Sequence, residues 1–218
     1  MNRRTLLTVA SIGPILSGCL YSRYFDLEWD EEVQLPGGRV IVVHLKHIYE
    51  RLSQGLTPYG GRIISRDSTL TFDAGNPAGT VTQLFKGFDP MFLGQHEGAW
   101  YAVLYGGYYG GSRNLPGQDW GELEGPYDQW AIKLVSGAWT PISMAELPAS
   151  FERPNLMLLY GTPKEHSQFA GHRVTLLDKA EWLKKYPPGY SDIRLTRPTA
   201  ASPKRPSSSN ETTQGVRK

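Results

Sequence analysis

The sequence predicts a mainly β protein: a single antiparallel β-sandwich or partly open barrel with one or two short helices. Apolar and polar residues alternate in short runs, Gly, Pro or Asp separates these runs, and helical periodicity is scarce. Many short alternating segments between turns are typical of sandwiches and barrels. Residues 27–195 contain enough aromatic and aliphatic side chains for one core, so we expect one domain there.

The first hairpin is predicted at residues 27–49. One side of its first strand carries Leu27, Trp29, Glu31, Val33 and Leu35. Such period-two alternation indicates a half-buried strand. Pro36-Gly37-Gly38 then favours a turn, because proline fixes φ and glycine accepts positive φ, and the run 39–49 resumes the alternation.

Further strands are expected at 68–72, 80–85, 99–105, 129–135, 156–160 and 173–177. The run 99–105 is apolar on both faces, which predicts a central strand. In 129–135, Trp130, Ile132 and Leu134 are expected to point inward and Lys133 outward. Gly-Ala-Trp occurs at both 98–100 and 137–139, each time after a turn signal, which favours hairpins.

Two short helices are expected where capping-box spacing occurs, at Ser143–Glu146 and at Asp178–Glu181. The second leads into Trp182 and Leu183, and Pro187-Pro188 is expected to end it.

Residues 1–18 have the order of an export signal: Arg3 and Arg4, an apolar stretch, and a small-residue exit. The stretch is too short for a permanent transmembrane helix. Leu16-Ser17-Gly18-Cys19 resembles the lipobox of bacterial lipoproteins, which implies cleavage between Gly18 and Cys19 and acylation of Cys19. Several acyl chains anchor a protein stably, so residues 19–26 are expected to be a lipidated tether. An ordinary signal peptide with an incidental cysteine is the alternative.

The export route and the final membrane are open at this point. Asn2-Arg3-Arg4-Thr5-Leu6-Leu7 resembles a twin-arginine signal, although ordinary signals also carry paired arginines. Leu20 follows the cysteine, not the aspartate that resembles an inner-membrane retention signal in enteric bacteria. We therefore expect the outer membrane, with the domain facing the periplasm.

The C-terminal residues 196–218 are rich in Pro, Ser and Thr, which predicts a disordered tail. Five basic residues against Glu211 give this tail a net charge of +4. Without Arg3 and Arg4, the 23 basic residues become 21 against 21 acidic ones, so residues 20–195 carry about −4. This balance argues against nucleic acid as a partner.

Patterns of metal and nucleophile chemistry are missing from the sequence. His44 and His47 would point to opposite faces of a strand, and His96, His166 and His172 have no acid or cysteine at ligand spacing. We therefore expect no metal and no cofactor. The sequence contains neither a Gly-x-Ser-x-Gly elbow nor a Ser-x-x-Lys pair. The only cysteine is assigned to acylation, which leaves none for thiol catalysis.

The segment from Tyr105 to Tyr127 combines aromatic residues, glycines and acids. Tyr108, Tyr109, Trp120 and Tyr127 are candidate ligand-binding residues, because aromatic rings stack on sugars. The acids Asp119, Glu122, Glu124 and Asp128 are candidate catalytic residues, because a carboxylate pair can hydrolyse a glycosidic bond. The alternative is an ordered Ω-type loop whose rings pack on the sheet and whose acids face water.

The signal, the hairpins and the Gly-Ala-Trp segments resemble envelope lipoproteins of Gram-negative bacteria, a resemblance that brings no activity with it. We expect a membrane-anchored, non-catalytic cell-envelope protein that binds a protein partner or cell-wall glycan. The alternatives are a glycan-acting hydrolase that uses the acids of residues 119–128 and a pure scaffold in a larger envelope complex.

Overall fold

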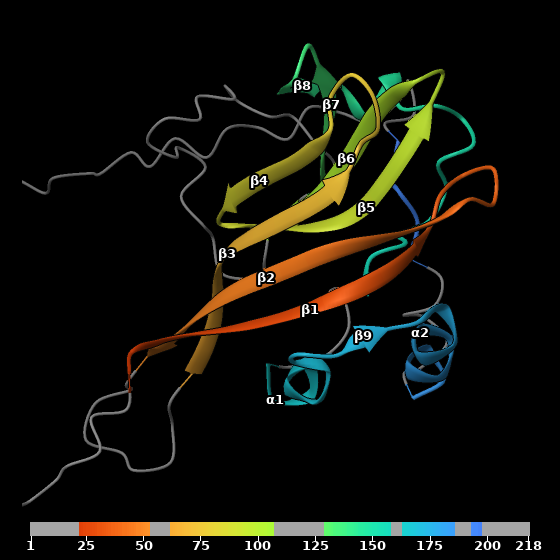
Figure 1. Ribbon diagram of the computed structural model, residues 1–218. Coiled ribbons are helices and arrows are strands. Elements are labelled where there is room, and N and C mark those ends of the chain that lie inside the picture. The colour runs from red at the N-terminus through yellow and green to blue at the C-terminus, as the bar shows by residue number, and fades with distance from the viewer. Residues whose placement is uncertain (1–21, 53–61, 107–128, 158–162, 186–192, 198–218) are drawn as a thin grey trace, which may run out of the picture.

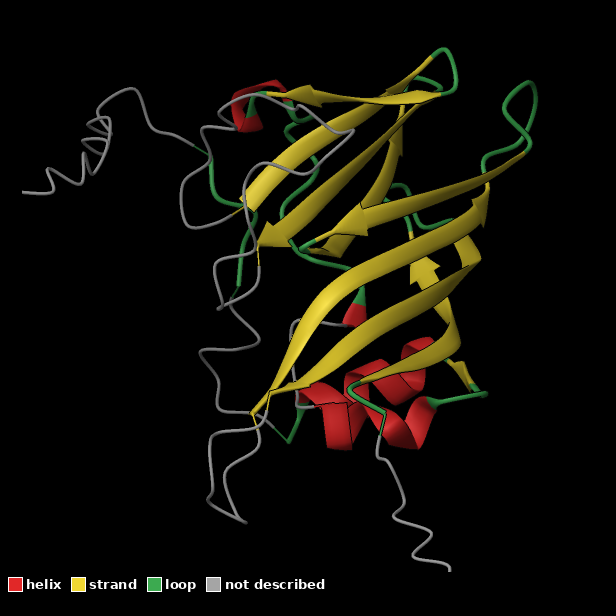
Figure 2. Cartoon of the chain, turned by 90° about the vertical axis from the view of Figure 1, so that its left-hand side faces the viewer, coloured by secondary structure: helices red, strands yellow, loops and turns green. Residues whose placement is uncertain are grey.

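The computed structural model describes residues 22–52, 62–106, 129–157, 163–185 and 193–197. It shows two β-sheets packed face to face, with short helices beside one of them (Figures 1 and 2). The first sheet contains β1 (Tyr24–Gln34), β2 (Val40–Leu52), β3 (Arg62–Asp73), β4 (Thr80–Lys86) and β9 (Arg173–Val174). The second contains β5 (Phe88–His96), β6 (Ala99–Gly106), β7 (Gln129–Val135) and β8 (Ala138–Ile142). The predicted β-sandwich class is confirmed.

The strand order is β4-β3-β2-β1-β9 in the first sheet and β5-β6-β7-β8 in the second. All neighbours are antiparallel except β1 and β9, which pair in parallel. The chain passes from the first sheet to the second through Gly87 alone, which lies between β4 and β5 with φ +73°. Only glycine adopts such a φ without strain, so this residue permits the abrupt change of direction.

The predicted hairpins form. β1 and β2 pair from Gln34–Val40 to Tyr24–Glu50, so β1 begins three residues before the predicted strand. Gly98 and Gly137, from the two Gly-Ala-Trp segments, have positive φ in the turns β5–β6 and β7–β8. Both tryptophans that follow, Trp100 and Trp139, contact Phe72 of the first sheet.

The main core lies between the sheets. It contains Trp29, Leu45 and Leu70 from the first sheet and Ala102 and Leu104 from the second. As predicted, β6 is a central strand, and β7 turns Trp130, Ile132 and Leu134 to this core.

A second core covers the outer face of the second sheet. Tyr101 and Val103 of β6 and Ala131 of β7 pack there against Phe151 and Leu195 from the irregular segments that follow the strands. Lys133 is on this face too, half-buried, with its Nζ 5.3 Å from the Tyr101 ring centroid. The second sheet is therefore covered on both faces.

The helices are η2 (Met144–Glu146), α1 (Pro163–His166), η4 (Ser167–Phe169) and α2 (Leu176–Leu183). The capping box of Ser143 and Glu146 is present at η2. The second predicted box was misplaced: α2 begins earlier, with Thr175 as its N-cap and Asp178 as the partner. α1 and α2 lie beside the β1–β9 edge (Figure 1).

Two predicted strands were wrong in the described residues. Leu156 and Met157 are not in a strand; they are buried in the main core. The strand predicted at 173–177 keeps only Arg173 and Val174, because α2 begins at Leu176. Two strands, β5 and β8, were not predicted, since Gly94, Pro90 and Pro141 interrupt their patterns.

None of the helices in the described part of the chain is long and apolar enough to span a membrane. The described structure also extends past residue 195. Thr196 N donates to Gln129 Oε1, and Arg197 Nη2 donates to the carbonyl oxygens of Pro148 and Phe151. The first two residues of the predicted tail are therefore fixed to the domain.

Candidate functional site

The site residues predicted from the sequence lie outside the described residues. These are Gly18 and Cys19 at the N-terminus and Tyr108, Tyr109, Asp119, Trp120, Glu122, Glu124, Tyr127 and Asp128. The described strands do fix where the segment 107–128 leaves the domain. Tyr105, two residues before this segment, is paired with Gln129, the first residue after it, on the adjacent strand, and Tyr105 is also paired with Asp89 of β5.

The same end of the sandwich contains a buried polar cluster built from three strands. His47 of β2 and Ser68 of β3 have no exposed surface, and Asp89 of β5 has 14% of its side chain exposed. His47 Nδ1 is 2.7 Å from Ser68 Oγ and 3.4 Å from Asp89 Oδ1. Ser68 Oγ donates to Asp89 Oδ1 at 2.5 Å, and Ser65 Oγ donates to the same oxygen at 3.0 Å.

These bonds determine the charge of Asp89. Burial alone would raise the pKa of its carboxyl, but the hydrogen bond and charge of His47 and the two serine hydroxyls outweigh burial and lower the pKa below its ordinary value. Tyr49 is next to this carboxylate, and burial together with the Asp89 charge raises the pKa of its hydroxyl. Asp89 is therefore ionised and Tyr49 is neutral near neutral pH.

The cluster contains Ser, His and Asp, but their arrangement differs from that of a catalytic triad. In a triad the serine binds one imidazole nitrogen and the carboxylate the other, so that the imidazole can take the serine proton. Here Ser68 and Asp89 are both on the Nδ1 side, and the serine proton points to Asp89. With Ser68 fully buried, its hydroxyl is not placed to attack a substrate.

The other nitrogen of the His47 ring faces an aromatic environment. The ring stacks on Trp29 with centroids 5.0 Å apart, and Tyr49 lies 6.3 Å away. The Tyr49 hydroxyl is 3.4 Å from Nδ1 of His166 on α1, and the His166 ring also contacts Trp29. Nε2 of His47 is buried and has no hydrogen-bond partner among the described residues, which is costly for a polar atom.

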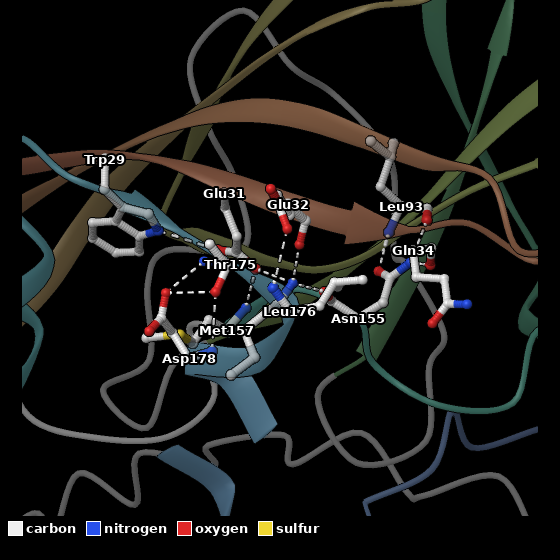
Figure 3. Close-up of polar contacts among 11 residues, drawn as sticks. Trp29, Glu31, Glu32, Gln34, Leu93, Asn155, Met157, Thr175, Leu176 and Asp178 are labelled. Atoms are coloured by element: carbon white, nitrogen blue, oxygen red, sulfur yellow. Dashed lines mark hydrogen bonds and ion pairs between the residues drawn. The ribbon is translucent and has the colours of Figure 1, made fainter. Parts of the chain in front are cut away.

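A second buried group is Glu31, which β1 turns into the core as its alternation predicts. Its carboxylate accepts from Trp29 Nε1 at 3.1 Å and from the Met157 amide at 2.9 Å (Figure 3). Lys179 Nζ of α2 forms an ion pair with Glu31 Oε1 at 2.6 Å. The same Nζ donates to the carbonyl oxygens of Glu32 and Asn155, both at 2.6 Å.

Asn155 extends this network to the second sheet. Its Nδ2 donates to the carbonyl oxygens of Gln34 in β1 and Leu93 in β5, and its Oδ1 accepts from the Leu93 amide (Figure 3). Through Lys179 and Asn155 the network joins α2 to β1 and β1 to β5, so it holds the helix and the two sheets together.

A third ionic group lies at the surface, where β1 begins and β2 ends. Arg23 and Arg66 each bind Glu50 through Nε and Nη2, Arg23 at Oε1 and Arg66 at Oε2. Burial alone would raise the pKa of Glu50, but the hydrogen bonds and charges of Arg66 and Arg23 outweigh it, so the pKa is lowered. We call Arg23, Glu50 and Arg66 the arginine clamp.

No group of three or more His, Cys, Asp and Glu side chains among the described residues is placed to hold a metal ion. His44 and His47 do point to opposite faces of β2: His44 Nδ1 is 3.0 Å from Asp30 Oδ1 on the outer face, whereas His47 is in the interior.

Neither the clamp nor the Ser68–Asp89 pair was predicted from the sequence. One signal was available, because Glu31 and His47 are polar residues at inward positions of alternating strands. Such residues need buried partners. The sequence could not indicate that Ser68 and Asp89 would supply them, since β5 was not predicted.

Comparison with protein-family models, with curated proteins and with solved structures finds no match for this chain.

Proposed function

We propose that this protein is a lipid-anchored cell-envelope protein that binds a protein partner or cell-wall glycan without catalysing a reaction. The anchor is supported by the lipobox-like run that ends at Cys19, the only cysteine of the chain. The position of the fold is compatible with it, because β1 begins at Tyr24, five residues further on.

The anchor is tested by intact-mass measurement of the protein purified from bacterial membranes. The expected mass is that of the chain from Cys19 plus acyl groups, and the protein should sediment with the outer membrane. Cys19→Ala should give an unacylated protein that is released from the membrane. A wild-type protein cut elsewhere and free of acyl groups would refute the anchor.

The proposal that the protein catalyses no reaction rests on the direction of the hydrogen bond that the Ser68 hydroxyl donates. It donates inward to Asp89, on a serine without exposed surface, so this cluster stabilises the interior. Glu31 is likewise used in holding α2 to the sheets.

The proposed ligand contacts remain Tyr108, Tyr109, Trp120 and Tyr127. They are supported by their residue types and by the pairing of Tyr105 with Gln129, which brings both ends of the segment to the covered second sheet. Gly106 is required at this point, because a Cβ there would overlap the Trp130 ring. A segment held at both ends on central strands can present its side chains from a rigid support.

Crosslinking in intact envelopes, followed by purification and identification of bound protein and glycan, tests the ligand. Replacement of Tyr108, Tyr109 and Trp120 by alanine should abolish recovery of the ligand, whereas Tyr24→Ala, an exposed tyrosine of β1, should not. Unchanged recovery with the triple variant would refute these contacts. Turnover of cell-wall glycan that Asp119→Asn, Glu122→Gln, Glu124→Gln or Asp128→Asn abolishes would instead establish the hydrolase alternative.

A further inference from the structure

The arginine clamp presents two fixed guanidinium groups to solvent. The Glu50 side chain has no exposed surface, while the Arg23 and Arg66 side chains are 66% and 43% exposed. Both arginines contact the buried Glu50 carboxylate while their own side chains reach solvent. The carboxylate therefore acts as a hidden support for the pair.

Each clamp arginine keeps donors for a second anion. A guanidinium has five N–H donors in a fixed plane. Contacts with Glu50 use Nε and Nη2, and no described residue accepts a hydrogen bond from Nη1 of Arg23 or Arg66. Because Glu50 already holds both arginine side chains in place, they lose little further conformational entropy when an anion binds them. Bidentate binding by arginine favours planar or tetrahedral oxyanions such as phosphate.

Further arginines near the arginine clamp add to its positive charge. Arg51 follows Glu50 in β2, with its Nη1 bonded to the Ser22 carbonyl oxygen and its guanidinium 4.0 Å from the Phe25 ring centroid. Arg62 begins β3 opposite Leu52. The described side chains of Arg23, Arg51 and Arg66 against Glu50 give this end of the sheet a formal charge of +2.

The nearest acids do not cancel this charge. Asp26 on the outer face of β1 is paired with Lys46 at 2.5 Å. Asp67 keeps its charge when it accepts from the Gly87 amide, but it lies opposite Lys86 of β4, so each of these acids has a basic residue as its neighbour. The positive end therefore contrasts with residues 20–195 as a whole, which carry about −4.

The position of the clamp in the chain favours a lipid headgroup over a free anion as the source of the phosphate. Arg23 is four residues after Cys19, and four residues reach at most about 14 Å. Acyl chains on Cys19 would place that residue at the bilayer surface, so Arg23 would stay close to the headgroups. Charges act on an anionic surface within a Debye length of about 8–10 Å. A free anion would need no such proximity.

We propose that the arginine clamp binds the phosphate of anionic phospholipid headgroups and so orients the domain with this end toward the membrane. The inference rests on the proposed lipid anchor. In this orientation the β1–β2 turn, at the opposite end of the hairpin, points away from the bilayer (Figure 1). The acyl chains hold the protein at the membrane, and the clamp sets the orientation of the domain relative to the membrane.

The test uses the chain from residue 19 with Cys19→Ala, which contains every described residue and carries no lipid. Its binding to phosphatidylcholine vesicles, with and without added phosphatidylglycerol, is measured by co-sedimentation. We expect binding only to the anionic vesicles. Each arginine near an anionic surface contributes about a five-fold gain in affinity. Arg23→Gln should therefore weaken binding about five-fold, and Arg23→Gln with Arg66→Gln about 25-fold.

The matched control is Arg39→Gln with Arg153→Gln, which removes the same charge elsewhere. Arg39 is at the turn end of the hairpin, with Nη2 bonded to Gln95, and Arg153 is exposed. Equal losses in the two double variants would overturn the proposal, because general charge or the basic tail would then explain binding. If the clamp double variant unfolds, Arg23→Gln alone decides, since Arg66 still covers Glu50.

Two further outcomes separate the possible failures. If free inorganic phosphate displaces the protein from vesicles at millimolar concentration, the clamp is a soluble-phosphate site and the lipid assignment is wrong. If Cys19 is acylated in cells but the Cys19→Ala chain does not bind anionic vesicles, only the clamp proposal fails. If vesicles bind but Cys19 carries no lipid, the anchor fails, and with it the orientation.

Discussion

At the scale of single residues, Asp89 shows how this sandwich keeps a carboxylate charged in its interior. Three groups from two other strands, His47, Ser65 and Ser68, surround one of its oxygens. A largely buried carboxylate is tolerated only with such partners. The cluster thus joins β2 and β3 of the first sheet to β5 of the second.

The first prediction concerns this carboxylate. Asp89→Asn should lower the free energy of unfolding by about 2–3 kcal/mol, because the amide cannot accept from all three partners at one oxygen and leaves buried polar groups unpaired. Urea unfolding measures the change. Asp30→Asn, which affects only an exposed pair with His44, should cost under about 0.5 kcal/mol. Similar losses in both variants would show that the cluster contributes nothing special.

The second prediction is loss of stability in acid. The pKa values of Asp89 and Glu50 are lowered in the folded protein. Such groups contribute stability that is complete above the pKa of the unfolded chain, about 4, and is lost as pH falls through the folded pKa. The urea midpoint should therefore decrease as the pH falls below about 4. Asp89→Asn should make this decrease shallower; an unchanged slope would mean that Asp89 does not titrate in this range.

At the scale of elements, α2 is attached to β1 by Lys179 and by a hydrogen bond from the Leu176 amide to Glu32 Oε2 at 3.3 Å. Lys179 meets the Glu31 carboxylate and two carbonyl oxygens, while the capping box of Thr175 and Asp178 fixes where the helix begins (Figure 3). Trp182 adds apolar contact with Phe169 and His166. The helix is thus held by a buried ion pair at its middle and aromatic packing at its end.

The third prediction tests this attachment by a double-mutant cycle. Lys179→Met should cost about 3–5 kcal/mol, because it leaves the Glu31 charge buried without its partner. Adding Glu31→Gln should recover part of that loss, since the uncompensated charge is then gone. Urea unfolding of the four proteins gives the coupling energy. Additive losses in the double variant would contradict a direct Glu31–Lys179 interaction.

At the scale of the whole molecule, the two sheets are unequally covered. Sheet β5-β6-β7-β8 has a hydrophobic core on each face, and Ala102, Val103 and Leu104 of β6 have no exposed surface. The first sheet has one core face, while Tyr24, Val40, Val42 and Leu84 of its other face are exposed. The second sheet is therefore the more protected half.

The fourth prediction follows from this difference. Amides of β6 should exchange with solvent most slowly, at the rate set by global unfolding, because β6 is hydrogen-bonded on both sides and covered on both faces. The edge strand β4, paired only with β3, should exchange faster. Hydrogen exchange followed by mass spectrometry distinguishes the two strands. Slower exchange in β4 than in β6 would contradict this account.

Much of the fold could be predicted from the local pattern. The alternation at 27–35 placed Trp29 and Glu31 inward, and the two-sided apolar run at 99–105 indicated a central strand, because side chains alternate with a period of two. The Gly-Ala-Trp segments marked two turns. The strands β5 and β8 were not predictable in this way, since glycine and proline interrupt their patterns although the sheet tolerates them.

The sequence by itself determined the β class, the hairpins and the resemblance to a lipobox, since each depends on residues that are neighbours along the chain. Only the tertiary structure decided the clusters. His47, Ser68 and Asp89 follow one another at intervals of 21 residues, and Glu31 and Lys179 are 148 positions apart, so no local pattern relates them. Their meeting is set by strand order and by the crossing at Gly87. The physical reason is that burial and hydrogen bonding act through space, whereas propensity acts along the chain.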